Sequence, residues 1–137
     1  MFILDQRLRN DTLEIGRLEL SLLLLMNDRS LPWLILVPEI EGIREIDDLP
    51  ADDRAKLIEE IALAASVIRS LYHPDKINIG ALGNLVPQFH MHVIGRFIND
   101  RAWPGPIWGT GPVEKYGGDE IKTVSERIRT AFEGKIK

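Results

Sequence analysis

The stretch Gln88-Phe89-His90-Met91-His92-Val93-Ile94-Gly95-Arg96 carries the clearest pattern in the chain. Successive side chains of a β-strand point to opposite faces of a sheet. Alternation therefore sends three apolar side chains to one face, namely Phe89, Met91 and Val93. The other face receives four hydrogen-bonding side chains, namely Gln88, His90, His92 and Arg96. The pattern predicts a half-buried strand from Gln88 to Phe97.

Two interpretations of the polar face of this strand stay open. In the first, the face is a solvated surface, because histidines on exposed strands are common. In the second, it is a binding site in which His90, His92 and the cation of Arg96 meet one ligand. A guanidinium suits a phosphate or a carboxylate better than it suits a metal ion.

The sequence on both sides of this stretch predicts further strands and two helices, from apolar periods of two and of about 3.6 residues. The other expected strands are Leu18 to Asn27, Trp33 to Val37 and Lys76 to Leu82. The expected helices are a long one from near Pro50 to near His73 and a final one opened by Gly117 and Gly118. Strands in a run beside two helices predict a single α+β domain, residues 1–137, with an antiparallel sheet.

The composition excludes several classes of protein. A chain of 137 residues with 45% apolar residues can bury a core without disulfides. The absence of cysteine excludes a thiol nucleophile, a disulfide framework and cysteine-based metal sites. The net charge of −4 argues against a general nucleic-acid binder. The longest apolar runs are too short to cross a bilayer and the opening residues lack a secretory h-region, so we expect a cytoplasmic protein with no membrane partner.

The segment from Gly83 to Arg96 resembles the signature of the histidine-triad (HIT) family, which reads His-φ-His-φ-His-φ-φ, where φ is apolar, after an upstream glycine and amide residue. The last two histidines match at His90 and His92, and Gly83-Asn84 matches the upstream pair. Outside the motif, Leu34 to Pro38 and Trp103-Pro104 are also similar to family sequences. The chain departs from the pattern at two positions. Gln88 takes the first triad position, and Trp33 stands where many members have a further histidine.

The resemblance implies a fold, a reaction and a set of site residues. The implied fold is an antiparallel sheet of about five strands with one long central helix and a C-terminal helix. The implied reaction is attack by His90 on the α-phosphate of a dinucleoside polyphosphate or a nucleotide conjugate, assisted by His92. The implied nucleotide-binding residues include Asn27, which matches a ribose-contacting residue of the family. They are joined by three residues in and around the motif, namely Asn84, Gln88 and Arg96.

The resemblance also bears on cofactors and partners. Because the nucleophile is a side chain, no cofactor and no metal are expected. Members of the family usually pair, so we expect a homodimer, with Trp103 and Trp108 as candidate interface residues.

Two alternatives to this reaction remain at this point. The chain could be a nucleotide-binding module with little turnover, because Gln88 cannot carry a charge or relay a proton. His90 and His92 could instead be metal ligands, although two histidines are too few alone and no carboxylate lies at an obvious ligand spacing.

Overall fold

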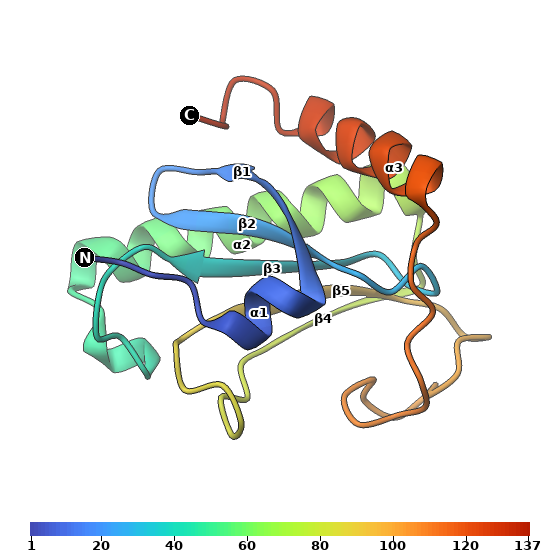
Figure 1. Cartoon of the computed structure of the whole chain (residues 1–137), viewed down its shortest axis with the longest axis horizontal. Coiled ribbons are helices and arrows are strands. Elements are labelled where there is room, and N and C mark those ends of the chain that lie inside the picture. The colour runs from blue at the N-terminus through green and yellow to red at the C-terminus, as the bar shows by residue number, and fades with distance from the viewer.

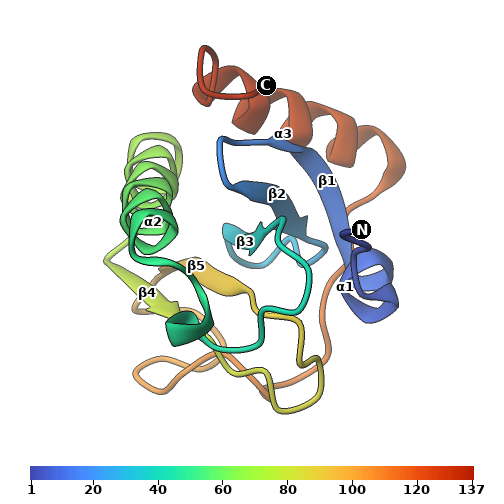
Figure 2. The same cartoon turned by 90° about the vertical axis from the view of Figure 1, so that its left-hand side faces the viewer.

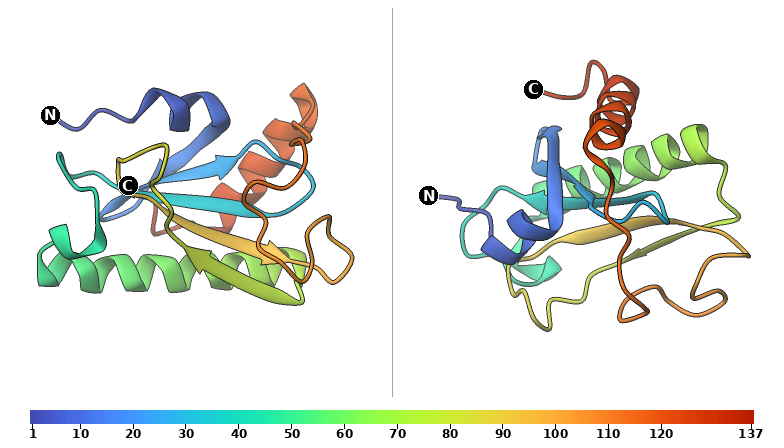
Figure 3. Two further views of the ribbon diagram at one scale, coloured as in Figure 1. Left: turned by 90° about the horizontal axis from the view of Figure 1, so that it is seen from below. Right: turned by 45° about the vertical axis from the view of Figure 1, so that its right-hand side comes forward.

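The computed structural model describes all 137 residues and is built on one five-stranded sheet (Figure 1). The strands are β1 (Thr12–Arg17), β2 (Ser21–Met26), β3 (Trp33–Pro38), β4 (Lys76–Gly80) and β5 (Met91–Arg96). They lie in the order β1-β2-β3-β5-β4, and every neighbouring pair is antiparallel. The left-hand view of Figure 3 shows strands β2, β3, β5 and β4 side by side. The predicted α+β fold class is therefore confirmed.

The helices lie on different sides of the sheet. They are α1 (Gln6–Asp11), α2 (Ala51–Tyr72) and α3 (Gly118–Ala131), with a short 3₁₀ turn at Ile46–Asp48. Figure 2 shows α2 on one side of the sheet and α1 on the other, with α3 beyond β1. None of these helices is both long enough and apolar enough to cross a membrane.

The elements confirm most of the expected boundaries and correct others. The long helix ends at Tyr72, and α3 begins at Gly118, both as predicted. Helix α1 and strand β1 were not predicted. The strand predicted from Gln88 is shorter and begins at Met91. Residues before Met91 are bonded elsewhere, since Pro87 has no N–H to donate and the N–H of Phe89 donates to the carbonyl of Ile43.

Each face of the sheet has its own apolar core. The larger cluster joins α2 to alternate residues of the central strands, among them Leu23, Leu25, Leu34, Leu36 and Val93. The second cluster lies on the opposite face and joins the intervening residues to α1 and to the loop after β5, among them Leu4, Leu8, Leu24, Ile35, Ile94 and Ile107. This explains why β2 and β3 are buried along almost their whole length. A sheet covered on both faces leaves only its edges and loops open to ligands.

Candidate active site

The histidine-bearing face of β5 is buried rather than solvated. Strand pairing places His92 opposite Ile35 on β3 and opposite Gly80 on β4. Only 7% of His90, 5% of His92 and 1% of Arg96 is exposed. The loop that follows β5 leads around this side of the molecule toward α3 (Figure 3), and its Ile107 packs in the second core. The interpretation of a solvated polar face was therefore wrong, and the predicted alternation of side chains is confirmed.

His90 has one ring nitrogen occupied and one free. Its Nδ1 lies 2.7 Å from the backbone carbonyl oxygen of Gln88. A carbonyl can only accept, so Nδ1 carries the proton and donates. In the neutral ring the lone pair then belongs to Nε2, because the two nitrogens of an uncharged imidazole have opposite roles. This tautomer presents Nε2 as a nucleophile.

His92 has the opposite arrangement. The indole Nε1–H of Trp33 donates to Nδ1 of His92 at 2.9 Å, so the proton of the neutral His92 ring lies on Nε2. Burial, with a smaller contribution from the nearby His90, lowers the pKa of His92 to about 3. The two rings meet edge to face, with centroids 5.0 Å apart. The site thus combines a free Nε2 on His90 with a neutral Nε2–H donor on His92.

The low pKa of His92 predicts a loss of stability on acidification. Between pH 6.5 and 3 the unfolded chain protonates this imidazole and the folded chain does not, so the free energy of unfolding is expected to fall as the pH is lowered. The contribution is complete above pH 6.5 and declines by up to about 1.4 kcal/mol per pH unit below it. Urea unfolding at pH 7, 6 and 5 measures the decline. His92→Asn is the control, since it lacks the titrating group; parallel pH profiles for both proteins would contradict the prediction.

A protein-family model matches a large part of the chain. The model described as "HIT domain" matches residues 7–99, more than half of the chain. The chain belongs to the HIT family.

Solved structures of HIT proteins superimpose on nearly the whole chain. A histidine triad (HIT) protein from Sinorhizobium meliloti 1021 is 46% identical, covers 96% of this chain and 97% of its own, and gives a TM-score of 0.92. A histidine triad protein from Marinobacter aquaeolei VT8 is 41% identical, with 98% of each chain covered and a TM-score of 0.95. A hypothetical histidine triad nucleotide-binding protein from Sulfolobus tokodaii strain7 is 15% identical, covers 89% and 84% of the two chains, and has the same fold with a TM-score of 0.67. No curated protein matches the chain.

Arg96 lies on the histidine face of this HIT domain, but its charge is already neutralised. Its guanidinium donates twice to the carboxylate of Asp100, at 2.8 and 3.0 Å, and also to Asn78 Oδ1 and the carbonyl of Gly105. With 1% of the residue exposed, the guanidinium is enclosed within the domain. These hydrogen bonds fasten the loop after β5 to the sheet, so the geometry adds no support to the expectation that Arg96 binds the nucleotide.

The amide residues expected to bind a nucleotide lie in different settings. Asn84 is exposed in the loop between β4 and β5. Asn27 follows β2 and is half-buried, and its Oδ1 accepts from the backbone N–H of Tyr116 at 3.0 Å. Gln88 lies two residues before His90, and both the oxygen and the nitrogen of its side-chain amide make hydrogen bonds to the N-terminal segment. Of the three, only Gln88 has a direct hydrogen bond to a catalytic candidate, through its backbone carbonyl.

Three residues of the site were not assigned there from the sequence. Trp33 fixes the tautomer of His92, and Trp108 packs edge to face on the same ring with centroids 5.4 Å apart. Gly80 makes room for Trp108, since a Cβ at position 80 would lie 3.0 Å from the indole. The sequence could not have indicated this role of Gly80, because nothing in the local sequence distinguishes it from a glycine that merely ends a strand.

The two tryptophans of the loop after β5 pack within their own domain. Trp108 contacts His92 and Gly80 as described, and the ring of Trp103 lies 5.9 Å from the guanidinium carbon of Arg96. Tryptophans commonly hold a loop on a core in this way. Both tryptophans are only half-buried, so their expected role as interface residues stays a prediction.

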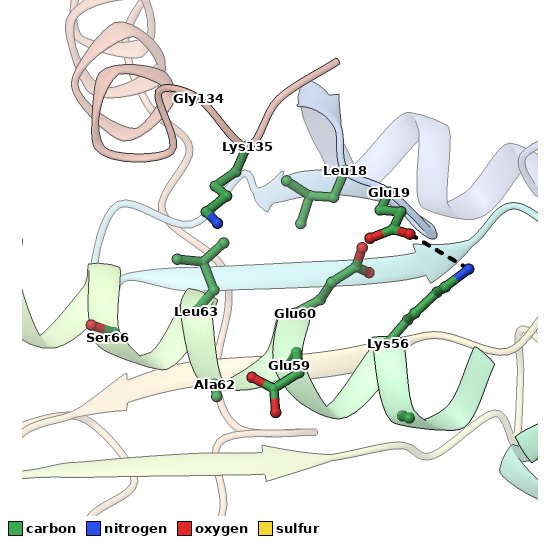
Figure 4. A pocket seen from close by; sticks show the side chains of 11 residues that line it. Leu18, Glu19, Lys56, Glu59, Glu60, Ala62, Leu63, Ser66, Gly134 and Lys135 are labelled. Carbon is green, nitrogen blue, oxygen red and sulfur yellow. Dashed lines mark ion pairs between the residues drawn. The ribbon is translucent and has the colours of Figure 1, made fainter. Parts of the chain in front are cut away.

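A groove of the molecule lies away from the histidines. It measures about 800 Å³ and runs between α2, the turn from β1 to β2, and the segment after α3 (Figure 4). Glu60, Leu63 and Lys135 face into it, and Lys56 pairs with Glu19 at its side. Because α2 covers the opposite face of the sheet, this groove contains none of the predicted site residues.

Proposed function

We propose that this HIT protein binds a nucleotide and cleaves or transfers at its α-phosphate through a covalent nucleotidyl-histidine on His90. The observation that carries the proposal is the hydrogen bond from His90 Nδ1 to the Gln88 carbonyl, which leaves Nε2 as the free nitrogen. Two further points support it. The HIT family includes nucleotide hydrolases and transferases, and the Sulfolobus tokodaii protein of the same fold is described as nucleotide-binding. We favour dinucleoside polyphosphates or nucleotide conjugates as substrates.

In the first proposed step, the Nε2 lone pair of His90 forms a bond to the α-phosphorus. The phosphorus–oxygen bond to the leaving group breaks, and its electron pair departs with the leaving oxygen. His90 then carries hydrogen on Nδ1 and phosphorus on Nε2, and is positively charged. The Gln88 carbonyl that accepts from Nδ1 stabilises this charge. A neutral His92 donates from Nε2 to a phosphate oxygen or to the departing oxygen.

In the second proposed step, water or another acceptor attacks the same phosphorus. The phosphorus–nitrogen bond breaks and its electron pair returns to Nε2, which restores the starting tautomer. The proton of the attacking hydroxyl leaves with solvent or with the departed oxygen. The two displacements replace one difficult reaction by two easier ones.

The direct test is incubation with a panel of adenylated compounds in the presence of a chelator, followed by analysis of the products. Release of a nucleoside monophosphate by the wild type, and none by His90→Asn, supports the proposal. Turnover that is lost in chelator and restored by one equivalent of zinc supports a metal site instead. Tight binding of AMP or ATP without any product supports a nucleotide-binding module, and both of these outcomes overturn the proposed chemistry.

We also propose that the chain forms a homodimer through the open edge of β4. Strand β4 ends the sheet, and its Ile79 is 49% exposed. A free edge with an exposed apolar side chain favours pairing with another strand. Light scattering at micromolar protein is expected to give about twice the mass of 15.5 kDa.

The expected effect of Ile79→Lys is a shift to monomer, because a charge on an edge strand disfavours pairing. Val113→Lys is the matched control, since Val113 is 50% exposed in a loop, and it should stay dimeric. A monomeric wild type would overturn the dimer, and equal effects of the two lysines would overturn the assignment to β4.

A further inference from the structure

The side-chain amide of Gln88 bridges two backbone groups of the N-terminal segment. Its Nε2 donates to the carbonyl of Ile3 at 2.9 Å, and its Oε1 accepts from the N–H of Asp5 at 2.8 Å. Both hydrogen-bonding ends of the amide are therefore used by residues more than 80 positions away in the sequence. A side chain engaged at both ends is held in one orientation.

A third hydrogen bond joins the same two parts of the chain. Arg7 Nη1 donates to the carbonyl of Leu85 at 2.9 Å. The segment is also anchored independently of Gln88, because Leu4 and Leu8 are buried in the second core. Loss of the Gln88 amide should therefore loosen residues 3–5 without unfolding α1.

The backbone carbonyl of Gln88 orients the proposed nucleophile, His90. Its carbonyl accepts from His90 Nδ1 at 2.7 Å and so sets which nitrogen of that ring is free. One residue thus holds the N-terminal segment with its side chain and orients His90 with its backbone. Rotation of the Gln88 peptide would break the bond to His90, and the fixed side chain restrains that rotation.

We propose that Gln88 is a positioning residue, in which the amide clamp on Ile3 and Asp5 fixes the carbonyl that orients His90. The effect on turnover rests on the proposed function, whereas the clamp itself does not. Gln88 is then not a weakened first member of the triad. It occupies the first triad position as a residue that holds the N-terminal segment and orients His90.

Histidine cannot reproduce this clamp. A carboxamide presents a donor and an acceptor on one planar group, and here each reaches one of two backbone groups two residues apart. The two nitrogens of an imidazole lie on diverging bonds, so the ring can serve one of the two backbone groups at a time. Restoring the family residue by Gln88→His is therefore expected to lower the rate rather than raise it.

The clamp is tested by amide hydrogen exchange, followed residue by residue by NMR in the full chain without ligand. In Gln88→Met and Gln88→His the Asp5 amide is expected to exchange at least tenfold faster than in the wild type. Gln6→Met is the matched control, because Gln6 is the other glutamine of the chain and its amide makes only an exposed bond to Asn10 within α1. Wild-type protection of Asp5 in both Gln88 variants, or equal loss in Gln6→Met, would overturn the clamp.

The link between Gln88 and His90 is tested by two measurements, the NMR signal of the His90 ring nitrogens and the single-turnover rate. We expect Gln88→Met and Gln88→His to broaden or shift the His90 Nδ1–H signal and to lower the single-turnover rate about tenfold, with less than a threefold change in nucleotide affinity. An unchanged rate, or a faster one in Gln88→His, together with lost Asp5 protection would overturn the positioning role. If the wild type shows no turnover, the proposed function fails, and the exchange and ring-nitrogen data still decide whether Gln88 clamps the segment and orients His90.

Discussion

Replacing His90 with asparagine is expected to lower the rate of the chemical step by several orders of magnitude, the scale seen when a covalent nucleophile is removed. Asparagine has no ring nitrogen that can take the place of Nε2, so the first phosphorus–nitrogen bond cannot form. Folding and nucleotide affinity should stay nearly unchanged, because the side-chain amide nitrogen of asparagine can donate to the Gln88 carbonyl in place of His90 Nδ1, and the side chain is shortened only a little. Single-turnover rates and AMP titration measure the two effects separately.

The other histidines provide the controls for this variant. His92→Asn should cost less, because His92 donates a hydrogen bond and forms no covalent bond in the proposed reaction. His73→Asn should leave the rate unchanged. His73 is exposed at the end of α2 with a backbone φ of 51°, a conformation that asparagine tolerates well.

The proposed covalent intermediate gives an independent measurement. Acid lability and base stability are expected of a phosphorus–nitrogen bond, so the wild type quenched in base with a labelled substrate should retain label on the peptide that contains His90. Acid treatment should then release it. Rates for the wild type and His90→Asn that agree within a few-fold would remove His90 from the mechanism, whatever label is found.

The largest loss of stability is expected from Asp100→Ala. The Asp100 carboxylate accepts two hydrogen bonds from Arg96 and one each from the backbone N–H groups of Phe97, Ala102 and Trp103. These donors hold the pKa of the Asp100 carboxyl far below its ordinary value. Removing it leaves the Arg96 cation buried without a counter-charge, which costs about 3–5 kcal/mol in proteins. Denaturant unfolding measures the loss.

An exposed ion pair of the same type is the matched control. Arg29 and Glu120 also make a two-point contact, at 3.0 and 3.1 Å, but their side chains are 49% and 38% exposed. The side chains of Arg96 and Asp100 are 2% and 4% exposed. Glu120→Ala is therefore expected to cost about 1 kcal/mol or less. Similar losses in the two variants would show that burial does not determine the contribution of the Arg96–Asp100 pair.

The sequence predicted those elements whose own pattern was strong. The apolar stripe of α2 repeats over about four turns, from Leu57 to Leu71, and the end of the helix at Tyr72 is marked by the following Pro74. By contrast, α1 has only six residues and depends on the packing of Leu8, and a helix this short has little local stability. Strand β1 lies at the sheet edge with Ile15 as its one fully buried residue, so its sequence has little apolar alternation.

The candidate site was predictable where it depended on one strand. Alternation alone placed His90 and His92 on one face. The tautomer of His92 depends on Trp33, 59 residues earlier, and the pairing of Arg96 depends on a loop that folds back on the sheet. The contact with Trp33 leaves no local signature, and Asp100 lies only four residues after Arg96 but pairs with it because the loop folds back. A buried arginine and an exposed one look the same in a linear pattern, which is why Arg96 was expected to meet a ligand.

The bridge between the N-terminal segment and the loop before β5 has a consequence for how the protein is made. Residues 3–7 leave the ribosome early, but their partners at positions 85–88 follow about 80 residues later. Contacts of such long sequence separation close late, because the entropy of a large loop must be overcome first. During synthesis the emerging β1–β2 hairpin can pair while His90 is still untranslated. The candidate site therefore takes its final shape only after the β1–β2 hairpin has formed.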